Sequence, residues 1–219
     1  MEPKIAIIIV LFQTPEKEIQ RLKKEIDALK FKNYQIYLID NTGKNLGYGR
    51  GLNLGIKKAL KDGCQLFICA NSDISLKKLT GQIILNGFDK YHLWGLPMRQ
   101  NNKIYYGGLL DRWHMSGYLV TRKRKTIDFI SGSLMVIKKE VFDKIGFFDE
   151  NYFLYYEDVD FCWRAKKAGY KLGILEKPAY EHFENSKNNP QKRNLLEKSR
   201  KKFLFKYGNF WQKIYDFFT

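Results

Sequence analysis

The stretch IAIIIVLFQTPEKEIQRLKKEIDALKFKNYQIYLID, residues 5–40, predicts a strand, a helix and a second strand in succession. Its beginning, Ile5–Phe12, is a continuous apolar run rich in Ile and Val, which is typical of a buried strand. Thr14 and Pro15 then suit an N-cap and a first helical residue, and apolar side chains recur behind them at helical spacing. Tyr34–Ile39 follows as a second strand. This order is typical of a βαβ unit, in which the two strands lie parallel.

The alternation of strands and helices continues to about residue 85. A glycine-rich stretch, Asn45–Asn53, leads into a helix, Gln65–Ala70 is predicted as a third strand, and Leu76–Leu85 as a helix. Successive βαβ units favour right-handed crossovers and a mostly parallel sheet. We therefore expect an α/β fold, a single Rossmann-like domain with a mostly parallel, mixed central sheet flanked by helices.

The rest of the chain is predicted to add short strands and several helices. The expected strands are Trp94–Met98, Lys103–Tyr106, Tyr118–Thr121, Ile127–Ile137 (interrupted at Ser131-Gly132-Ser133) and Lys171–Leu175. The expected helices are Lys139–Ile145, Glu157–Ala168 and one or two within Pro190–Phe218. We expect one domain at residues 1–185 and a basic, aromatic, helical extension at residues 186–219.

Composition excludes several classes of protein. Of 219 residues, 44% are hydrophobic, which is far too apolar for a disordered chain. The longest apolar run has eight residues, whereas a membrane-spanning helix needs about 20; no signal peptide is expected either. The three cysteines show no CxxC spacing, which favours a reducing compartment and disfavours a disulfide scaffold or a structural zinc site.

The charge of the chain predicts an anionic partner. Lys and Arg number 39 against 23 Asp and Glu, and the formal net charge is +16. Two basic segments stand out, Arg122–Lys125 and the extension from residue 186, where basic residues are interleaved with aromatic ones. The extension fits an amphipathic helix on an anionic membrane, or equally a core-packing helix with a charged outer face. No nucleic-acid-binding module is visible, so we expect no nucleic-acid partner.

Polar residues follow the predicted strands where each strand ends. The clusters are Asp40-Asn41, Asn71-Ser72-Asp73 and Glu181-His182. Asn, Asp and Ser are also common wherever a strand ends in a turn, so each cluster has a purely structural explanation. However, open α/β sheets bind their ligands at the carboxyl ends of their parallel strands. A carboxylate and an imidazole suit Mg²⁺ or Mn²⁺, so Asp73 and His182 are candidate metal ligands, although a lone histidine is more often structural.

Two further motifs each have a functional and a structural interpretation. Gly47, Gly49 and Gly51 suit either a phosphate-binding loop or a flexible start of a helix. The acidic residues at 157, 158 and 160 suit either the N-terminal end of a helix dipole or a general base whose pKa is raised by its neighbours.

Together these residues resemble a family-2 glycosyltransferase with the GT-A fold, of the rhamnosyltransferase-like branch. Four pieces carry the resemblance, in order and spacing from Ile5 to about His182: Ile5–Phe12 with Thr14-Pro15-Glu16; Asp40-Asn41 with Asn45–Gly55; Asn71-Ser72-Asp73 in the place of the family's DxD; and Ser131-Gly132-Ser133, Val141–Glu150, Phe153–Arg164, Ala168-Gly169-Tyr170 and His182. Asn71 departs from the first Asp of DxD, which would leave one carboxylate fewer for the metal.

The resemblance implies a role for each candidate residue. Asp158 would be the general base and Glu157 would shape the catalytic site. A divalent ion, Mg²⁺ or Mn²⁺, would bind Asp73 and His182. The nucleotide sugar would contact Leu11, Phe12, Asp40, Asn41, the stretch from Gly47 to Asn53, Asn71 and Ser72, and the donor or acceptor pocket would include Ser131, Gly132, Ser133 and Asp160.

The expected activity is an inverting, metal-dependent transfer of rhamnose or a hexose from a dTDP- or UDP-sugar. The acceptor would be a hydroxyl of a growing bacterial surface glycan, lipid-linked on a polyprenyl diphosphate. Such an enzyme would lie in the cytoplasm, peripheral on the inner face of the cell membrane. The alternatives are a nucleotidyltransferase, or a basic membrane- or nucleic-acid-binding module on a degenerate transferase scaffold.

Overall fold

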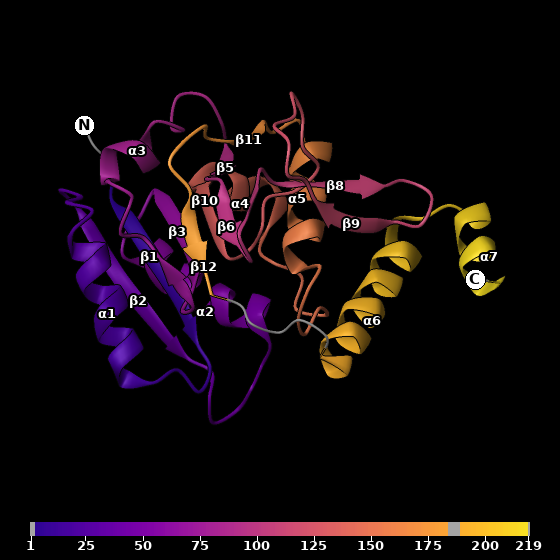
Figure 1. Cartoon of the computed structure of the whole chain (residues 1–219), viewed down its shortest axis with the longest axis horizontal. Coiled ribbons are helices and arrows are strands. Elements are labelled where there is room, and N and C mark those ends of the chain that lie inside the picture. The colour runs from indigo at the N-terminus through magenta and orange to yellow at the C-terminus, as the bar shows by residue number, and fades with distance from the viewer. Residues whose placement is uncertain (1–2, 184–188, 219) are drawn as a thin grey trace.

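The computed structural model describes residues 3–183 and 189–218 (Figure 1). The strands are β1 (Ile5–Leu11), β2 (Tyr34–Asp40), β3 (Leu66–Asn71), β4 (Ile74–Ser75), β5 (Leu93–Gly95), β6 (Met98–Gln100), β7 (Lys103–Tyr105), β8 (Gly108–Asp111), β9 (Ser116–Leu119), β10 (Leu134–Lys138), β11 (Leu172–Ile174) and β12 (Tyr180–His182). The helices are α1 (Glu16–Asp27), α2 (Tyr48–Lys61), α3 (Gly81–Leu85), α4 (Lys139–Ile145), α5 (Glu157–Lys167), α6 (Pro190–Tyr207) and α7 (Phe210–Phe218).

A six-stranded mixed sheet with the order β11-β5-β10-β3-β1-β2 forms the centre of the molecule. The strand β1 pairs in parallel with both β2 and β3. In contrast, β10 runs antiparallel to both of its neighbours, β3 and β5. The expected mostly parallel, mixed sheet flanked by helices is therefore confirmed.

Helices cover both faces of this sheet, which explains why β1 is apolar at every position. Alternate β1 residues belong to two hydrophobic clusters: Ala6, Ile8 and Val10 pack with α2 and α5, and the residues between them pack with α1 and α3. The helix α2 lies close to the sheet because it presents glycines there. A Cβ at Gly55 would lie 2.5 Å from the Ile8 side chain.

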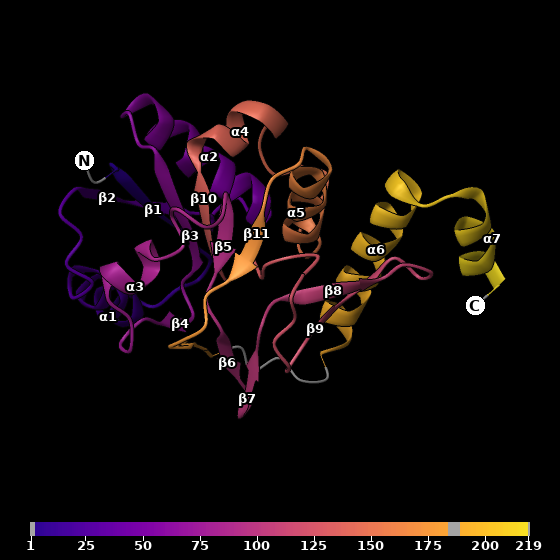
Figure 2. The ribbon, with the colours of Figure 1, turned by 90° about the horizontal axis from the view of Figure 1, so that it is seen from above.

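Two smaller sheets and the C-terminal helices complete the fold. One sheet has the order β4-β12-β6-β7, and the other is the β8–β9 hairpin. The helices α6 and α7 lie at the end of the molecule away from α1 and β2 (Figures 1 and 2). Phe203 and Leu204 of α6 are fully buried, so α6 packs on the core, as one of the two interpretations of the basic extension expected. The expected domain boundary, between residues 185 and 186, lies outside the described residues.

The local predictions fail where tertiary contacts outweigh local signals. Thr14 does not cap α1, whose N-cap is Pro15, because the Thr14 hydroxyl instead contacts Ser72 at 3.1 Å and accepts the Phe12 N–H. The helix expected over Leu76–Leu85 is only Gly81–Leu85, capped by Thr80.

The glycine-rich segment and the middle of the chain also differ from expectation. Helix α2 begins at Tyr48, so most of the glycine-rich stretch is helical. The strand expected over Ile127–Ile137 is reduced to β10. The β8 strand, Gly108–Asp111, had no counterpart in the prediction. Over the described residues, no helix is both long enough and apolar enough to span a membrane.

Candidate active site

Two neighbouring cavities lie at the carboxyl ends of the central strands. The larger is about 890 Å³ and the smaller about 370 Å³. Both are lined by Tyr48, Asn71, Asp73, Leu154 and Tyr155, so they meet at the carboxyl end of β3. This is the edge at which open α/β sheets bind their ligands.

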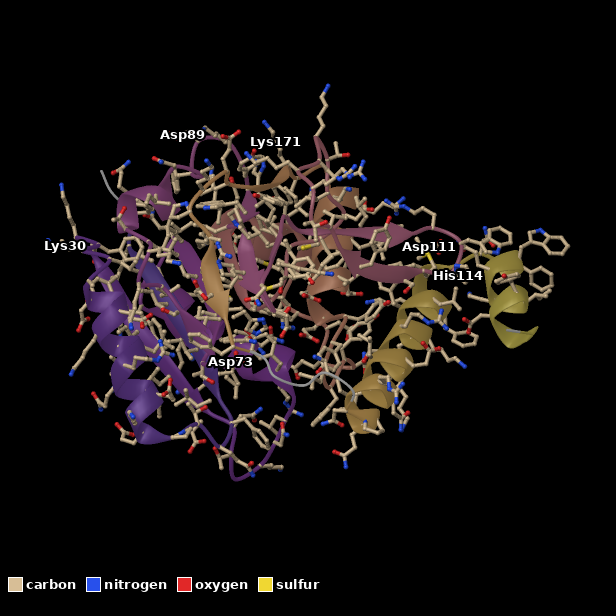
Figure 3. The ribbon with its side chains drawn as sticks, viewed as in Figure 1. Lys30, Asp73, Asp89, Asp111, His114 and Lys171 are labelled. Carbon is tan, nitrogen blue, oxygen red and sulfur yellow. The ribbon has the colours of Figure 1, made fainter. Side chains whose placement is uncertain are left out.

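Asp73 and His182 face each other where the cavities meet. Asp73 follows β3, His182 ends β12, and the two segments are joined because the Phe183 N–H donates to the Asp73 carbonyl at 2.8 Å. The Asp73 Oδ1 and His182 Nε2 atoms are 3.4 Å apart, and the Asn71 Nδ2 atom is also 3.4 Å from His182 Nε2. Figure 3 labels Asp73 at this end of the sheet.

The donor set at this point fits a divalent cation. Burial opposes ionisation of Asp73, but the hydrogen bond and charge of His182, together with hydrogen bonds from the backbone and Asn71, outweigh it and hold the pKa of Asp73 below its usual value. A carboxylate oxygen and an imidazole nitrogen 3.4 Å apart can both lie within about 2.0–2.3 Å of one ion. Among the described residues, no group of three His, Cys, Asp or Glu surrounds this point.

A second pair of carboxyl groups, Glu157 and Asp158, begins α5 and lines the smaller cavity. The chain enters α5 through Tyr155 and Tyr156, both with positive φ. Asp158 is held by backbone groups: its Oδ2 accepts the Gly132 N–H and its Oδ1 accepts the Val159 N–H, each at 2.8 Å.

The electrostatics of this pair favour one protonated and one ionised carboxyl group. Burial, and then the charge of Asp158, raise the pKa of Glu157 to about 8, and burial also raises the pKa of Asp158. The Glu157 Oε2 atom is buried and has no hydrogen-bond partner among the described residues. Because Asp158 accepts two backbone N–H groups, ionisation of the pair near neutral pH falls on Asp158 while Glu157 keeps its proton.

The loop after β2 shapes the floor of the larger cavity. Asn41 is buried, its Oδ1 accepts the Leu46 N–H at 2.9 Å, and its Nδ2 donates to the Gly47 carbonyl at 3.2 Å. Gly47 has φ +88°, and a Cβ there would lie 2.4 Å from the Phe153 carbonyl oxygen, so only glycine fits this close approach. The glycines of this stretch therefore pack α2 closely against the rest of the molecule.

Most of the other predicted site residues also line the cavities. Phe12 and Ser72 line the larger cavity, and Ser131, Gly132 and Ser133 line the smaller one. The Ser133 hydroxyl lies 2.6 Å from the Tyr180 hydroxyl, so the Ser-Gly-Ser turn is joined to β12.

Four predicted site residues do not line either cavity. Leu11 is buried within the sheet, and Asp40 is an exposed residue whose Oδ1 accepts the Thr42 N–H at 2.9 Å, which lowers the pKa of Asp40. Asn53 is buried against the backbone of Phe148, donating to its carbonyl and accepting its N–H.

Asp160, expected in the donor or acceptor pocket, instead anchors α6. Its carboxylate is fully buried and is bound by Arg164 Nε and Lys206 Nζ, each at 2.7 Å, and by the Tyr207 hydroxyl at 2.8 Å. The residue two positions from Asp158 faces away from the cavity because a helix turns about 100° per residue.

The α6 helix contributes cavity walls that the sequence did not predict. Gln191, Lys192 and Leu195 line the larger cavity, and Leu196 lines the smaller one. Tyr48 lies in the stretch expected at the nucleotide sugar, but its contact with the Ser-Gly-Ser turn was not predicted: its hydroxyl donates to the carbonyl of Gly132, the residue whose N–H binds Asp158, at 2.8 Å. The only sequence signal for Tyr48 was its place within the glycine-rich motif.

The fold is that of the GT-A glycosyltransferases. One similar solved structure is a variant of Drosophila β-1,4-galactosyltransferase 7 in complex with manganese, UDP-Gal and xylobiose. It has a TM-score of 0.59 and 14% identity, and the match covers 88% of this chain and 79% of that chain.

The chain belongs to the glycosyl transferase family described as family group 2, which residues 87–217 match. It is 27% identical over 159 residues to the low-salt glycan biosynthesis hexosyltransferase Agl10 of Haloferax volcanii, covering 63% of this chain and 48% of that protein. It is 23% identical over 211 residues to the dTDP-rhamnosyl transferase RfbF of Shigella flexneri, covering 80% of this chain and 67% of that protein. The chain therefore spans about half the length of the first of these relatives and two thirds of the second.

Proposed function

We propose that the chain catalyses the inverting, metal-dependent transfer of rhamnose or a hexose from a dTDP- or UDP-sugar to a glycan hydroxyl. The observation that carries this proposal is the convergence of a cation-binding pair, Asp73 and His182, and a carboxylate pair, Glu157 and Asp158, on two connected cavities. One cavity offers space for a nucleotide, and the other presents a base to an acceptor.

The larger cavity is the proposed donor site. Its lining includes the rings of Phe12 and Phe153, which are 46% and 41% exposed and can pack on a nucleobase. Lys192 of α6 adds a positive charge to the same cavity, which favours an anionic ligand there. The names of the two relatives, a hexosyltransferase and a dTDP-rhamnosyl transferase, support the choice of donor class.

In the proposed reaction, Asp158 accepts the proton of the acceptor hydroxyl in the smaller cavity. The acceptor oxygen forms a bond to the anomeric carbon as the bond from that carbon to the diphosphate oxygen breaks, and the nucleoside diphosphate leaves. The N–H groups of Gly132 and Val159 orient the Asp158 carboxylate for this step. A Mg²⁺ or Mn²⁺ ion held by Asp73 and His182 would neutralise charge on the diphosphate.

We further propose a lipid-linked acceptor, a growing bacterial surface glycan on a polyprenyl diphosphate, and a peripheral position on the cytoplasmic face of the cell membrane. In α7, Phe210 and Trp211 are 68% and 67% exposed, next to the lysine-rich α6. Basic residues with exposed aromatic rings favour an anionic membrane surface.

Flotation with anionic vesicles tests this: F210S/W211S should lose association, whereas the control Leu54→Ser on α2 should keep it. Equal flotation of all three proteins would contradict the proposal.

Thermal stabilisation by nucleotides tests the donor and metal assignments. We expect UDP or dTDP, but neither GDP nor CMP, to raise the melting temperature of the wild-type protein, and to do so only with Mn²⁺. Asp73→Ala should lose the Mn²⁺-dependent shift, whereas Asp89→Ala, at an exposed position far from the cavities, should keep it (Figure 3). A Mn²⁺-dependent shift that survives in Asp73→Ala would contradict the metal site.

Turnover with a competent acceptor tests the base. Asp158→Asn should keep the nucleotide-dependent shift and lose transfer by about 10²–10⁴-fold. Transfer at the wild-type rate in Asp158→Asn would exclude Asp158 as the base.

A further inference from the structure

A third cavity, of about 430 Å³, lies along β11, the edge strand of the central sheet. Of the residues described as lining it, none lines either cavity of the candidate active site. Lys171, directly before β11, lies on the opposite side of the view from Asp73 (Figure 3). The proposed transfer reaction gives this cavity no role.

Five cationic side chains from three separate segments line this edge cavity. Lys123, Arg124 and Lys125 come from the basic run that is prominent in the sequence, Lys166 comes from α5, and Lys171 precedes β11. Lysine and arginine are cationic at neutral pH. Segments far apart in the chain therefore converge to surround one space with positive charge.

Carboxylates balance only part of this charge. Glu176 lies 3.7 Å from Lys123, and Asp128 lies 2.7 Å from Lys166. Over the part of the chain that the structure describes, no carboxylate lies within 4.0 Å of the charged groups of Arg124, Lys125 or Lys171. Like charges gathered at a concave surface repel one another and raise the local concentration of anions.

Tyrosine rings hold two of the cations at the cavity. The Lys123 ammonium lies 5.9 Å from the centroid of Tyr106, and the Lys171 ammonium lies 5.4 Å from the centroid of Tyr91. Both rings line the cavity. Contacts of this kind restrict long lysine side chains without neutralising them, so the positive charge stays available to a ligand.

We propose that the edge cavity binds a phosphate-bearing anion. A phosphate group offers several charged oxygen acceptors, and an arginine beside lysines can satisfy them with charge-assisted hydrogen bonds. The volume of about 430 Å³ accommodates a diphosphate or a phosphorylated headgroup. The phosphate belongs either to a soluble ligand or to a lipid headgroup, and the two sources share this chemistry.

Calorimetric titration with inorganic pyrophosphate in EDTA tests the site on the full chain. Three proteins are compared: the wild type, K123A/R124A/K125A, and the control K32A/K58A/K61A, which removes the same charge from exposed positions outside the cavities. We expect the cavity variant to bind about tenfold more weakly or worse, and the control to stay within about twofold of the wild type. Equal weakening in both variants would show a general charge effect and overturn the proposal.

A second readout separates this site from the active site. In Asp73→Ala, pyrophosphate should still shift the backbone amide resonance of Gly173, on β11, even if the proposed transfer activity is wrong. Shifts confined to residues of the two active-site cavities would overturn the proposal.

Sedimentation with vesicles then identifies the source of the phosphate. All three proteins carry F210S/W211S in this assay, so that α7 does not hold them on the vesicles. If the phosphate is that of a lipid headgroup, vesicles containing phosphatidic acid should retain the protein with an intact cavity and the control but not the cavity variant. If it is a soluble ligand, the three proteins should sediment equally while their pyrophosphate affinities still differ. Equal sedimentation together with equal pyrophosphate affinity would refute an anion site at this edge.

Discussion

Replacing Glu157 with Gln tests whether this buried carboxyl keeps its proton in the folded protein. Glu157 is 5% exposed, and burial together with Asp158 raises its pKa from 4.5 to about 8. Between these pH values the folded state holds a proton that the unfolded state has lost. Its contribution to stability is therefore complete below about pH 4.5 and is lost as the pH rises toward 8.

The size of the effect follows from linkage. One proton bound only in the folded state lowers the free energy of unfolding by about 1.4 kcal/mol per pH unit. Glutamine does not titrate, so Glu157→Gln should lack this slope. From about pH 5.5 to about pH 7.5, the stability of the variant relative to the wild type should rise by about 3 kcal/mol. Urea unfolding at a series of pH values measures this difference directly.

The comparison over pH cancels any fixed cost of the amide, because that cost is the same at each pH. Glu16→Gln makes the same chemical change at an exposed position on α1 and serves as the control. Parallel pH profiles of wild type and Glu157→Gln would refute the argument that Glu157 keeps its proton in the folded protein.

Three other substitutions follow from contacts in the structure. Tyr48→Phe removes the hydrogen bond to the Gly132 carbonyl, and turnover should fall about fivefold, the equivalent of about 1 kcal/mol. The acidic limb of the pH–rate profile should shift, whereas the affinity for nucleotide should stay unchanged. Asn53→Ala leaves the Phe148 N–H and carbonyl without their partner, and chemical denaturation should show a loss of about 1–3 kcal/mol. Phe203→Ala removes a fully buried ring of α6 and should cost about 3–5 kcal/mol, which a fall in the denaturation midpoint would measure.

The central sheet could be predicted because its local and tertiary signals agree. The β1 strand is apolar at every position, since helices cover it on both faces, and its run of Ile and Val has no competing interpretation. The amphipathic pattern of α1 likewise survives in the structure, although its cap moves to Pro15. In contrast, β8 lies in a two-stranded hairpin, and its sequence, Gly-Leu-Leu-Asp, does not alternate between apolar and polar residues. Its pairing therefore depends on tertiary contacts that the sequence does not reveal.

The candidate site was predicted best where residues follow a strand. Asp73 and His182 are far apart in sequence, and strand topology alone brings them together. Asp160 belongs to the acidic motif of Glu157 and Asp158, and Asn53 ends the glycine-rich motif, but helix geometry directs these two side chains into the packing of α6 and of the loop at Phe148. A sequence motif shows which residues are neighbours in the chain. The face of the helix on which each residue lies determines whether its side chain lines the cavity.

The contribution of α6 to both cavities bears on the order in which the protein matures during synthesis. The strand β3, which precedes Asp73, and the loop that carries Gly47 leave the ribosome before α6, and β3 can pair with β1 as soon as it has formed. The walls formed by Lys192 and Leu196 come near the end of this sequence. A nascent chain can therefore complete its central sheet before α6 has been made, while both cavities are still open on one side. Under the proposed function, the full lining of the nucleotide site would form only once α6 has docked.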